Sequence, residues 1–247
     1  MKVVFHELYR EVYDVDPAAA RGRIDCIVDE LQGLFEFVEP QPAEESDLLL
    51  VHEHSHLELV KSRGLLYEIA VLSAGGAIKA AELAVQGEPA FALIKPPGHH
   101  ASSNSCWGFC WFNNVAIAVE KLRRRGIVNK VLIVDIDLHY GDGTNNIFAE
   151  KPEVFYYHLY GLSGLEKCLA MNTDCELIAV SAGFDMHVND WGDILLTEDY
   201  TTIAKMISKH ASRVCNGRFF AVLEGGYNQR ILGKNVKALL QGFDMAR

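Results

Sequence analysis

The sequence predicts an α/β protein in which a mostly parallel central sheet carries helices on both faces. Short apolar runs typical of buried strands alternate along the chain with longer segments of helical periodicity. Residues that can act as acids, bases or metal ligands follow directly after several of the strand-like runs, where ligands bind in parallel sheets. The 247 residues suffice for one sizeable core. We therefore expect a single-domain three-layer sandwich covering residues 1–247.

The elements expected in the first half of the chain begin with a strand at Lys2–Phe5 and a helix over Gly22–Leu34. The polar, proline-containing stretch Glu39–Ser46 predicts a surface loop. The apolar run Asp47–Val51 predicts the next strand, and Leu66–Val85 predicts a long helix.

The second half continues this alternation of strands and helices. Thr197, followed by Asp199 ahead of a periodic run, is typical of a helix start. The expected strands are Ala90–Ile94, Lys130–Asp135, Val154–Tyr157, Glu176–Val180 and Phe219–Leu223. The expected helices are Asn114–Arg125, Thr197–Val214 and Asn228–Phe243.

The charge balance argues against a nucleic-acid-binding surface. The formal net charge is −10, and the one basic run, Lys121–Arg125, is typical of a solvated helix end. An acidic surface favours a cationic partner such as a lysine-rich peptide or a polyamine. The chain shows neither a signal peptide nor an apolar stretch long enough to span a bilayer, so we expect no membrane partner and a cytoplasmic protein.

The six cysteines show no C-x-x-C pair and no dense framework, so we expect each of them to be a free thiol in the core. They are Cys26, Cys106, Cys110, Cys168, Cys175 and Cys215.

Acidic and imidazole side chains end the strand expected at Lys130–Asp135. Asp135, Asp137 and His139 alternate along the extended chain and therefore share a face. Placing these groups together beside a core strand is costly unless a cation lies among them. A divalent metal ion is the simplest cation, and a hydrogen-bonded cluster at the strand end is the alternative.

Asp185 holds the equivalent place after the strand expected at Glu176–Val180. Together with Asp137 and His139 it describes a catalytic metal site that keeps a position open for water. Oxygen and nitrogen donors suit Zn²⁺ and also allow Fe²⁺, Mn²⁺ or Co²⁺.

Two adjacent histidines, His99 and His100, follow the strand expected at Ala90–Ile94 and a rigid Pro-Pro-Gly turn. Imidazoles there suit proton transfer, whereas the alternative is a hydrogen-bonded pair in a loop. Asp135 and Asp142 remain after the metal has taken its ligands, and a carboxylate behind an imidazole fixes its tautomer.

A tyrosine follows the last expected strand. The paired glycines before Tyr227 permit a tight turn that presents its hydroxyl to the site, where a phenol can donate to a developing oxyanion. The alternative is a half-buried packing residue.

Two further clusters favour structural roles. The histidines of residues 52–56 begin an expected surface helix, and we interpret them as capping and surface polarity. The aromatic segment Gly108–Asn114 predicts core packing, with the wall of a channel for an aliphatic substrate as the alternative.

These blocks, in this order, resemble the histone deacetylase family, which includes acetoin-utilisation proteins and acetylpolyamine amidohydrolases. The resemblance implies one arginase-like α/β domain and hydrolysis of an acetylated amine, such as an acetyl-lysine peptide, an acetylpolyamine or a small metabolite. The matching stretches are Ala90–His100, Gly108–Asn114, Val134–Gly143, Ser181–His187 and Glu224–Asn228.

The resemblance also implies a role for each matched residue. Asp137, His139 and Asp185 would hold the metal, usually zinc, with a monovalent K⁺ or Na⁺ ion near Asp135. His99 and His100 would be the tandem histidines, backed by Asp135 and Asp142, and Tyr227 would polarise the acyl carbonyl. Phe109 would form one channel wall, and the Gly108 carbonyl would contact the substrate amide N–H.

Two segments, near residues 57–66 and 161–176, are shorter than the family usually has at the rim of the site. This leaves open a non-catalytic acyl-amine-binding member with an incomplete channel. An arginase-like ureohydrolase is a third reading, but it requires a second metal cluster, and the sequence suggests only one.

Overall fold

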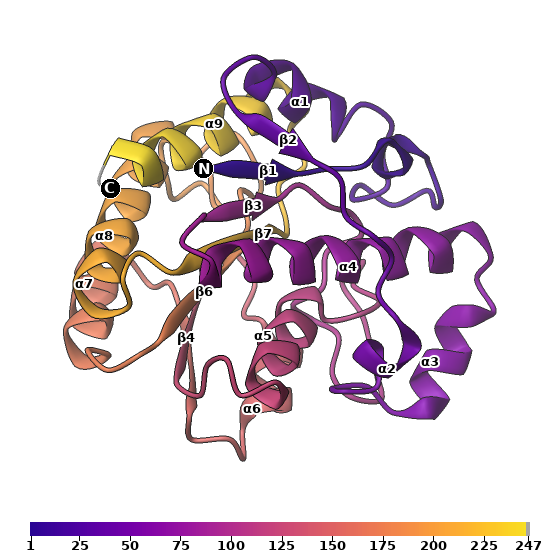
Figure 1. Cartoon of the computed structure of the whole chain (residues 1–247). Coiled ribbons are helices and arrows are strands. Elements are labelled where there is room, and N and C mark those ends of the chain that lie inside the picture. The colour runs from indigo at the N-terminus through magenta and orange to yellow at the C-terminus, as the bar shows by residue number, and fades with distance from the viewer. Residues whose placement is uncertain (246–247) are drawn as a thin grey trace.

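A seven-stranded, wholly parallel sheet forms the centre of the molecule, described here for residues 1–245 of a computed structural model (Figure 1). The strand order is β2-β1-β3-β7-β6-β4-β5. The strands are β1 (Lys2–Val4), β2 (Glu36–Val38), β3 (Ala90–Ala92), β4 (Val131–Asp135), β5 (Val154–His158), β6 (Leu177–Ala182) and β7 (Phe219–Leu223).

Helices cover both faces of the sheet, which confirms the expected fold class. Helices α4 and α5 pack on one face, and α1, α8 and α9 lie over the other (Figure 1). The helices are α1 (Asp25–Leu31), α2 (Glu45–Leu48), α3 (His54–Lys61), α4 (Leu65–Val85), α5 (Asn114–Arg124), α6 (Asp142–Phe148), α7 (Leu162–Met171), α8 (Thr197–Val214) and α9 (Gln229–Met245). Strands β4, β6 and β7 are buried throughout, as expected for a parallel sheet covered on both faces.

The strand predicted at Asp47–Val51 is wrong. Residues 45–48 form helix α2, and the second strand is β2, which precedes it. The Glu44 N–H donates to the Asp47 carboxylate, which caps the first turn of α2, and Lys121 binds the same carboxylate at 2.6 Å. Because a short apolar run suits a buried helical turn as well as a strand, its hydrophobicity alone did not distinguish the two.

Strand register brings the candidate site residues to one end of the sheet. Asp135 at the end of β4 pairs with Ser181 of β6, and Ala182 pairs with Leu223 of β7. Strands β3 and β4 are consecutive in the chain but are separated in the sheet by β6 and β7. This topological switch point is where ligands bind in open parallel sheets, beyond the carboxyl ends of the strands.

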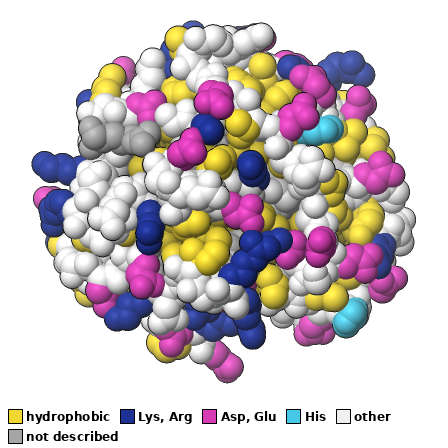
Figure 2. All heavy atoms as spheres, viewed as in Figure 1, with side chains coloured by type: hydrophobic (Ala, Val, Ile, Leu, Met, Phe, Trp, Pro, Cys, Tyr) yellow, Lys and Arg dark blue, Asp and Glu magenta, His cyan; other side chains and the backbone are white. Residues whose placement is uncertain are grey.

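The surface carries acidic and basic side chains side by side (Figure 2). The basic run at the end of α5 is tied to acidic neighbours: Arg123 pairs with Glu120 and Glu153, and Arg125 pairs with Glu82. Within residues 1–245, no helix combines the length and the apolar character that crossing a bilayer requires.

Candidate active site

Asp137, His139 and Asp185 converge at the carboxyl end of the sheet, with their potential ligand atoms all within 4.8 Å of one another. His139 Nδ1 lies 3.2 Å from Asp137 Oδ1 and 3.0 Å from Asp185 Oδ2. Both carboxylates are buried, whereas the His139 side chain is 37% exposed and faces the pocket. The sequence-predicted trio therefore forms one cluster with an open side.

The electrostatics of this trio suit a cation. Hydrogen bonds to Asp137 and then Asp185 raise the pKa of His139 to about 10. Burial, with the charge of Asp137, raises the pKa of Asp185 to about 6. Asp185 Oδ2 is buried, and the side chain near it is the partly exposed His139. Two buried carboxylates that share one imidazole lack compensating positive charge, so the donor set fits a divalent ion.

Backbone contacts and two glycines shape the trio. The Gly225 N–H donates to Asp137 Oδ2 at 2.8 Å, and the Leu138 N–H donates to Asp185 Oδ1 at 3.0 Å. A Cβ atom at Gly183 or Gly225 would collide with Asp137 Oδ2. Only glycine lets these turns approach the carboxylate closely, which explains both glycines after β6 and β7.

The two histidines after β3 each contact a carboxylate. His99 Nδ1 lies 3.0 Å from Asp135 Oδ2, and His100 Nδ1 lies 2.7 Å from Asp142 Oδ1. These contacts leave both Nε2 atoms available to the pocket, which His99 and His100 line. Tyr156 of β5 also donates to Asp135 Oδ2 at 2.9 Å and so helps to hold the first pair.

The environments of the two imidazoles drive their pKa values apart. Burial alone would lower the pKa of His99, but the charges of Asp137 and Asp135 raise it well above its usual value. Burial and the neighbouring charge of His99 lower the pKa of His100 to about 4. At neutral pH the pair therefore combines a charged His99 with a neutral His100 that can accept a proton.

Tyr227 lines the same pocket as the histidines and is fixed at both its backbone and its ring. The N–H groups of Tyr227 and Asn228 both donate to Asp190 Oδ2, at 2.9 and 2.8 Å. The Tyr227 ring stacks on Trp191, with centroids 4.1 Å apart, and meets the edge of Phe109 at 5.9 Å. The dipeptide Asp190-Trp191 therefore positions this tyrosine.

A pocket of about 220 Å³ joins these groups. Gly108 and Phe109 have positive φ angles of 59° and 68°, and a Cβ atom at Gly108 would collide with the His100 ring. The Trp107 indole packs on the His100 ring at 3.8 Å and donates to Asp142 Oδ2 at 2.8 Å. The lining residues are Pro97, His99, His100, Trp107, Gly108, Phe109, His139, Trp191, Gly225 and Tyr227.

Sequence reasoning missed Trp107 and Trp191 as pocket residues. Both are about half exposed, at 54% and 50%, although they are large aromatic side chains. Each lies within a few residues of a recognised motif, and that proximity was the available signal. The structure also reveals a second group of ligand-type side chains, His99, Cys110 and Glu224, which corrects the expectation of a single set.

The interpretation of the histidines at residues 52–56 as surface polarity is wrong for two of the three. His52 and His56 are 4% and 1% exposed, whereas His54 is exposed. His52 Nδ1 donates to the Ser102 carbonyl, and its Nε2 accepts from the Asn113 N–H, both at 2.9 Å. His52 therefore ties together the two ends of the loop that carries Gly108 and Phe109.

Lowering the pH is expected to destabilise the protein through His52. Burial, followed by the charge of His56, lowers the pKa of His52 to about 3. Its ordinary value is about 6.5, so the stability gained from the neutral ring is present above pH 6.5 and is lost as the pH falls toward 3. Between pH 7 and 5 this group should remove about 2 kcal/mol from the free energy of unfolding, measured by urea titration.

The comparison between variants isolates this contribution from other titrating groups. His52→Gln should show a smaller loss of stability between pH 7 and 5 than the unchanged protein, whereas His54→Gln should behave like the unchanged protein. An equal loss in His52→Gln would contradict the assignment.

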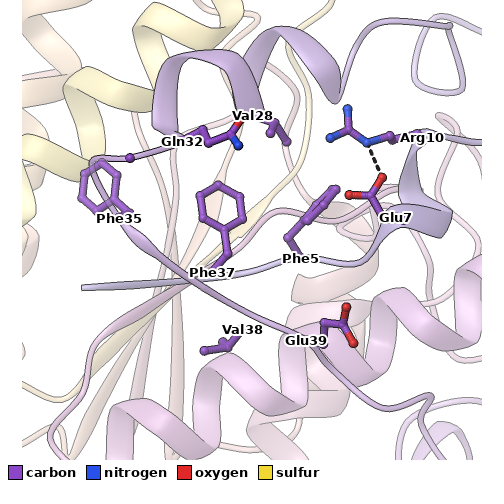
Figure 3. Close-up of a pocket in the computed structure, with 10 residues that line it drawn as sticks. Phe5, Glu7, Arg10, Val28, Gln32, Phe35, Phe37, Val38 and Glu39 are labelled. Carbon is purple, nitrogen blue, oxygen red and sulfur yellow. Dashed lines mark hydrogen bonds and ion pairs between the residues drawn. The ribbon is translucent and has the colours of Figure 1, made fainter.

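A larger cavity of about 480 Å³ lies away from this site, between α1 and the edge of the sheet at β1 and β2 (Figure 3). Phe5, Phe35 and Phe37 form its floor, and Glu7 hydrogen-bonds Arg10 at its side. It contains no paired histidine and carboxylate and no metal-type cluster, so its size does not make it the reactive site.

Comparisons with known proteins identify a family for this chain. The sequence model of the histone deacetylase domain matches residues 64–167 and 165–243. The chain is 31% identical to a probable deacetylase of Archaeoglobus fulgidus over 99% of this chain and 87% of the relative. It is 32% identical to a probable deacetylase of Methanothermobacter thermautotrophicus, over 84% and 79% of the two chains.

Other similar proteins include a histone deacetylase-like amidohydrolase of Pseudomonas aeruginosa, 31% identical over 76% of this chain and 65% of the relative. In structure, the chain is similar to the HDA15 HD domain, with a TM-score of 0.85 at 24% identity over 98% and 88% of the two chains. The structural match supports the fold, and the sequence matches support the family. The chain belongs to the histone deacetylase family.

Proposed function

We propose that this protein is a metal-dependent amidohydrolase that removes an acetyl group from an acetylated amine. One observation carries the proposal: a trio of metal-type ligands, two histidine–carboxylate pairs and a tyrosine meet around a single pocket. Hydrolysis of an unactivated amide needs a polarised carbonyl, an activated water and a proton for the leaving amine. The residues around the pocket offer a group for each requirement.

Asp137, His139 and Asp185 would hold the metal ion, for which Zn²⁺ is our first choice and Fe²⁺, Mn²⁺ or Co²⁺ the alternatives. When bound, such an ion supplies Lewis acidity and lowers the pKa of water. We also propose a monovalent K⁺ or Na⁺ ion near Asp135. In support, the buried Ser181 hydroxyl beside it has no hydrogen-bond partner.

The protein's own groups would move the protons. Neutral His100 accepts a proton from water at its Nε2, while Asp142 holds its Nδ1. Charged His99, backed by Asp135, stabilises negative charge that develops in the pocket. The Tyr227 hydroxyl donates to the oxyanion formed from the acyl oxygen, and His100 returns its proton to the leaving amine.

The pocket walls would orient an extended acyl-amine chain. The Gly108 carbonyl accepts the substrate amide N–H, and the Phe109 ring packs against the alkyl chain. Trp191 would supply a further wall, since it also lines the pocket. Within the short segment at residues 161–176, Leu162–Met171 form helix α7, which packs on α8. The alignment with the Archaeoglobus relative spans 314 positions against 247 residues here, which supports shortened segments in this chain.

The substrate class can be determined by measuring acetate release with metal-loaded protein. An acetyl-lysine peptide, an acetylpolyamine and a small acetylated metabolite are compared at equal concentration. One relative is a polyamine deacetylase of Danio rerio, 29% identical over 78% of this chain and 38% of the relative, and the acidic net charge also favours a cationic substrate. Turnover of any of the three supports the proposal. No turnover on all three, with metal bound, favours the non-catalytic acyl-amine-binding reading.

Trp191→Ala is expected to lower kcat for acetate release about 10-fold and also to raise KM. The substitution removes the stacking partner of Tyr227 and one wall of the pocket, and an aromatic pair contributes about 1 kcal/mol beyond burial. Trp191→Phe, which keeps an aromatic face, should retain most activity. A raised KM with unchanged kcat would show that Trp191 contacts substrate without positioning Tyr227.

A further inference from the structure

A second trio of ligand-type side chains lies directly beside the proposed metal site. His99 Nε2 is 3.7 Å from Asp137 Oδ1, and the ligand atoms of His99, Cys110 and Glu224 lie within 4.8 Å of one another. The three residues come from separate segments, after β3, before α5 and after β7. Their side chains are buried, with residue exposures of 3%, 2% and 0%.

Glu224 has one carboxylate oxygen in use and one without a partner. Its Oε2 accepts from the Gly98 and His99 N–H groups, at 2.7 and 3.2 Å. Its Oε1 is buried and receives no hydrogen bond. A buried carboxylate oxygen without a hydrogen-bond donor or a cation is costly. A positively charged group bound at Glu224 Oε1 would offset this cost.

His99 and Cys110 supply the complementary donors. Asp135 occupies His99 Nδ1, so Nε2 is the ring nitrogen that remains, on a residue that lines the pocket. The Cys110 thiol makes a long contact, 3.6 Å, to the Gly108 carbonyl. Sulfur, nitrogen and oxygen donors in one buried cluster suit Zn²⁺, and the pocket beside His99 gives the ion a route in.

We propose that His99 Nε2, Cys110 Sγ and Glu224 Oε1 form a second divalent metal site that inhibits the enzyme when filled. On binding, the thiol proton leaves to solvent and the sulfur binds the ion as thiolate. The ion occupies His99 Nε2, displaces any proton there and places a second divalent charge against Asp137. The inhibition rests on the proposed amidohydrolase activity, whereas the binding itself does not.

The test counts ions and reads the sulfur–metal bond without turnover. Metal-free protein is titrated with Co²⁺, and the thiolate-to-cobalt charge-transfer absorption in the near ultraviolet is recorded beside the bound-metal content. We expect two ions per chain, with the charge-transfer band appearing only as the Cys110 site fills. Cys110→Ser should bind one ion and lose the band, whereas Cys168→Ser, a buried thiol remote from the site, should behave like the unchanged protein.

Acetate release is then followed across a Zn²⁺ titration, with each protein's one-ion activity as its own reference. In the unchanged protein activity should rise with the first ion and fall at least 10-fold with the second. Cys110→Ser should lack the fall. One ion per chain without a charge-transfer band, or a band that survives in Cys110→Ser, would overturn the second site. Two bound ions, of which only the second depends on Cys110, with no turnover at any zinc level would keep the site and reject the proposed activity.

Discussion

Tyr227→Phe is expected to lower kcat for acetate release by about 100- to 1000-fold, the usual cost of removing one oxyanion donor. The substitution deletes only the hydroxyl, because Asp190 binds the backbone and Trp191 stacks on the ring. KM and the bound-metal content should change little. Kinetics on the best acetylated amine, with metal analysis of the same samples, provide the measurement.

Tyr140→Phe is the matched control for this substitution. Tyr140 is 43% exposed and its ring packs against Tyr156 outside the pocket, so its hydroxyl should contribute nothing to turnover. A Tyr227→Phe protein with near-normal kcat would remove the tyrosine from the proposed reaction and shift the oxyanion contact to other groups.

Asp185→Asn is expected to weaken binding of the proposed catalytic metal ion and thereby to lower turnover. The amide keeps the shape of the carboxylate but carries no charge, and its NH₂ group donates rather than binds a cation. We expect metal affinity at this site to fall by more than about 100-fold, since loss of even an outer-shell partner costs 10- to 100-fold. Dialysis against a metal buffer followed by elemental analysis measures the affinity, and acetate release measures the consequence.

Asp193→Asn, eight residues further along the same loop, serves as the control because Asp193 is exposed and lies outside the trio. Its φ of 50° also suits asparagine. Full metal retention and activity in Asp185→Asn would show that the ion is held elsewhere.

The fold class could be predicted because buried parallel strands have a distinctive pattern. Runs such as Val131–Val134 and Leu177–Val180 are apolar throughout, and the structure places them side by side. The incorrect predictions of secondary structure concern strand β2, at the edge of the sheet, and helix α2, which follows it. Strand β2 has three residues, none of them buried, so its apolar run is too short to indicate a strand, whereas the apolar run that begins with the buried leucine of α2 wrongly indicated one.

The site could be predicted where a residue follows a strand, because the ends of parallel strands meet at one edge. Asp137, Asp185 and Tyr227 came together for this reason. Trp191 could not be predicted, because its role depends on how one loop folds onto another. His52 was missed for a different reason: its two backbone partners are 50 and 61 residues away, and a histidine next to a helix start is usually a surface residue.

Because the chain crosses over between β3 and β4, the candidate site is complete only when the whole centre of the sheet has formed. The two imidazoles lie on the turn after β3, the acidic ligands follow β4 and β6, and the phenol follows β7. In the sheet, β6 and β7 lie between β3 and β4. A fragment that lacks residues 90–100 or 219–227 lacks either the two histidines or the tyrosine to which we assign the proton transfers and the oxyanion contact. A chain in which either segment is unfolded would therefore lack the proposed activity.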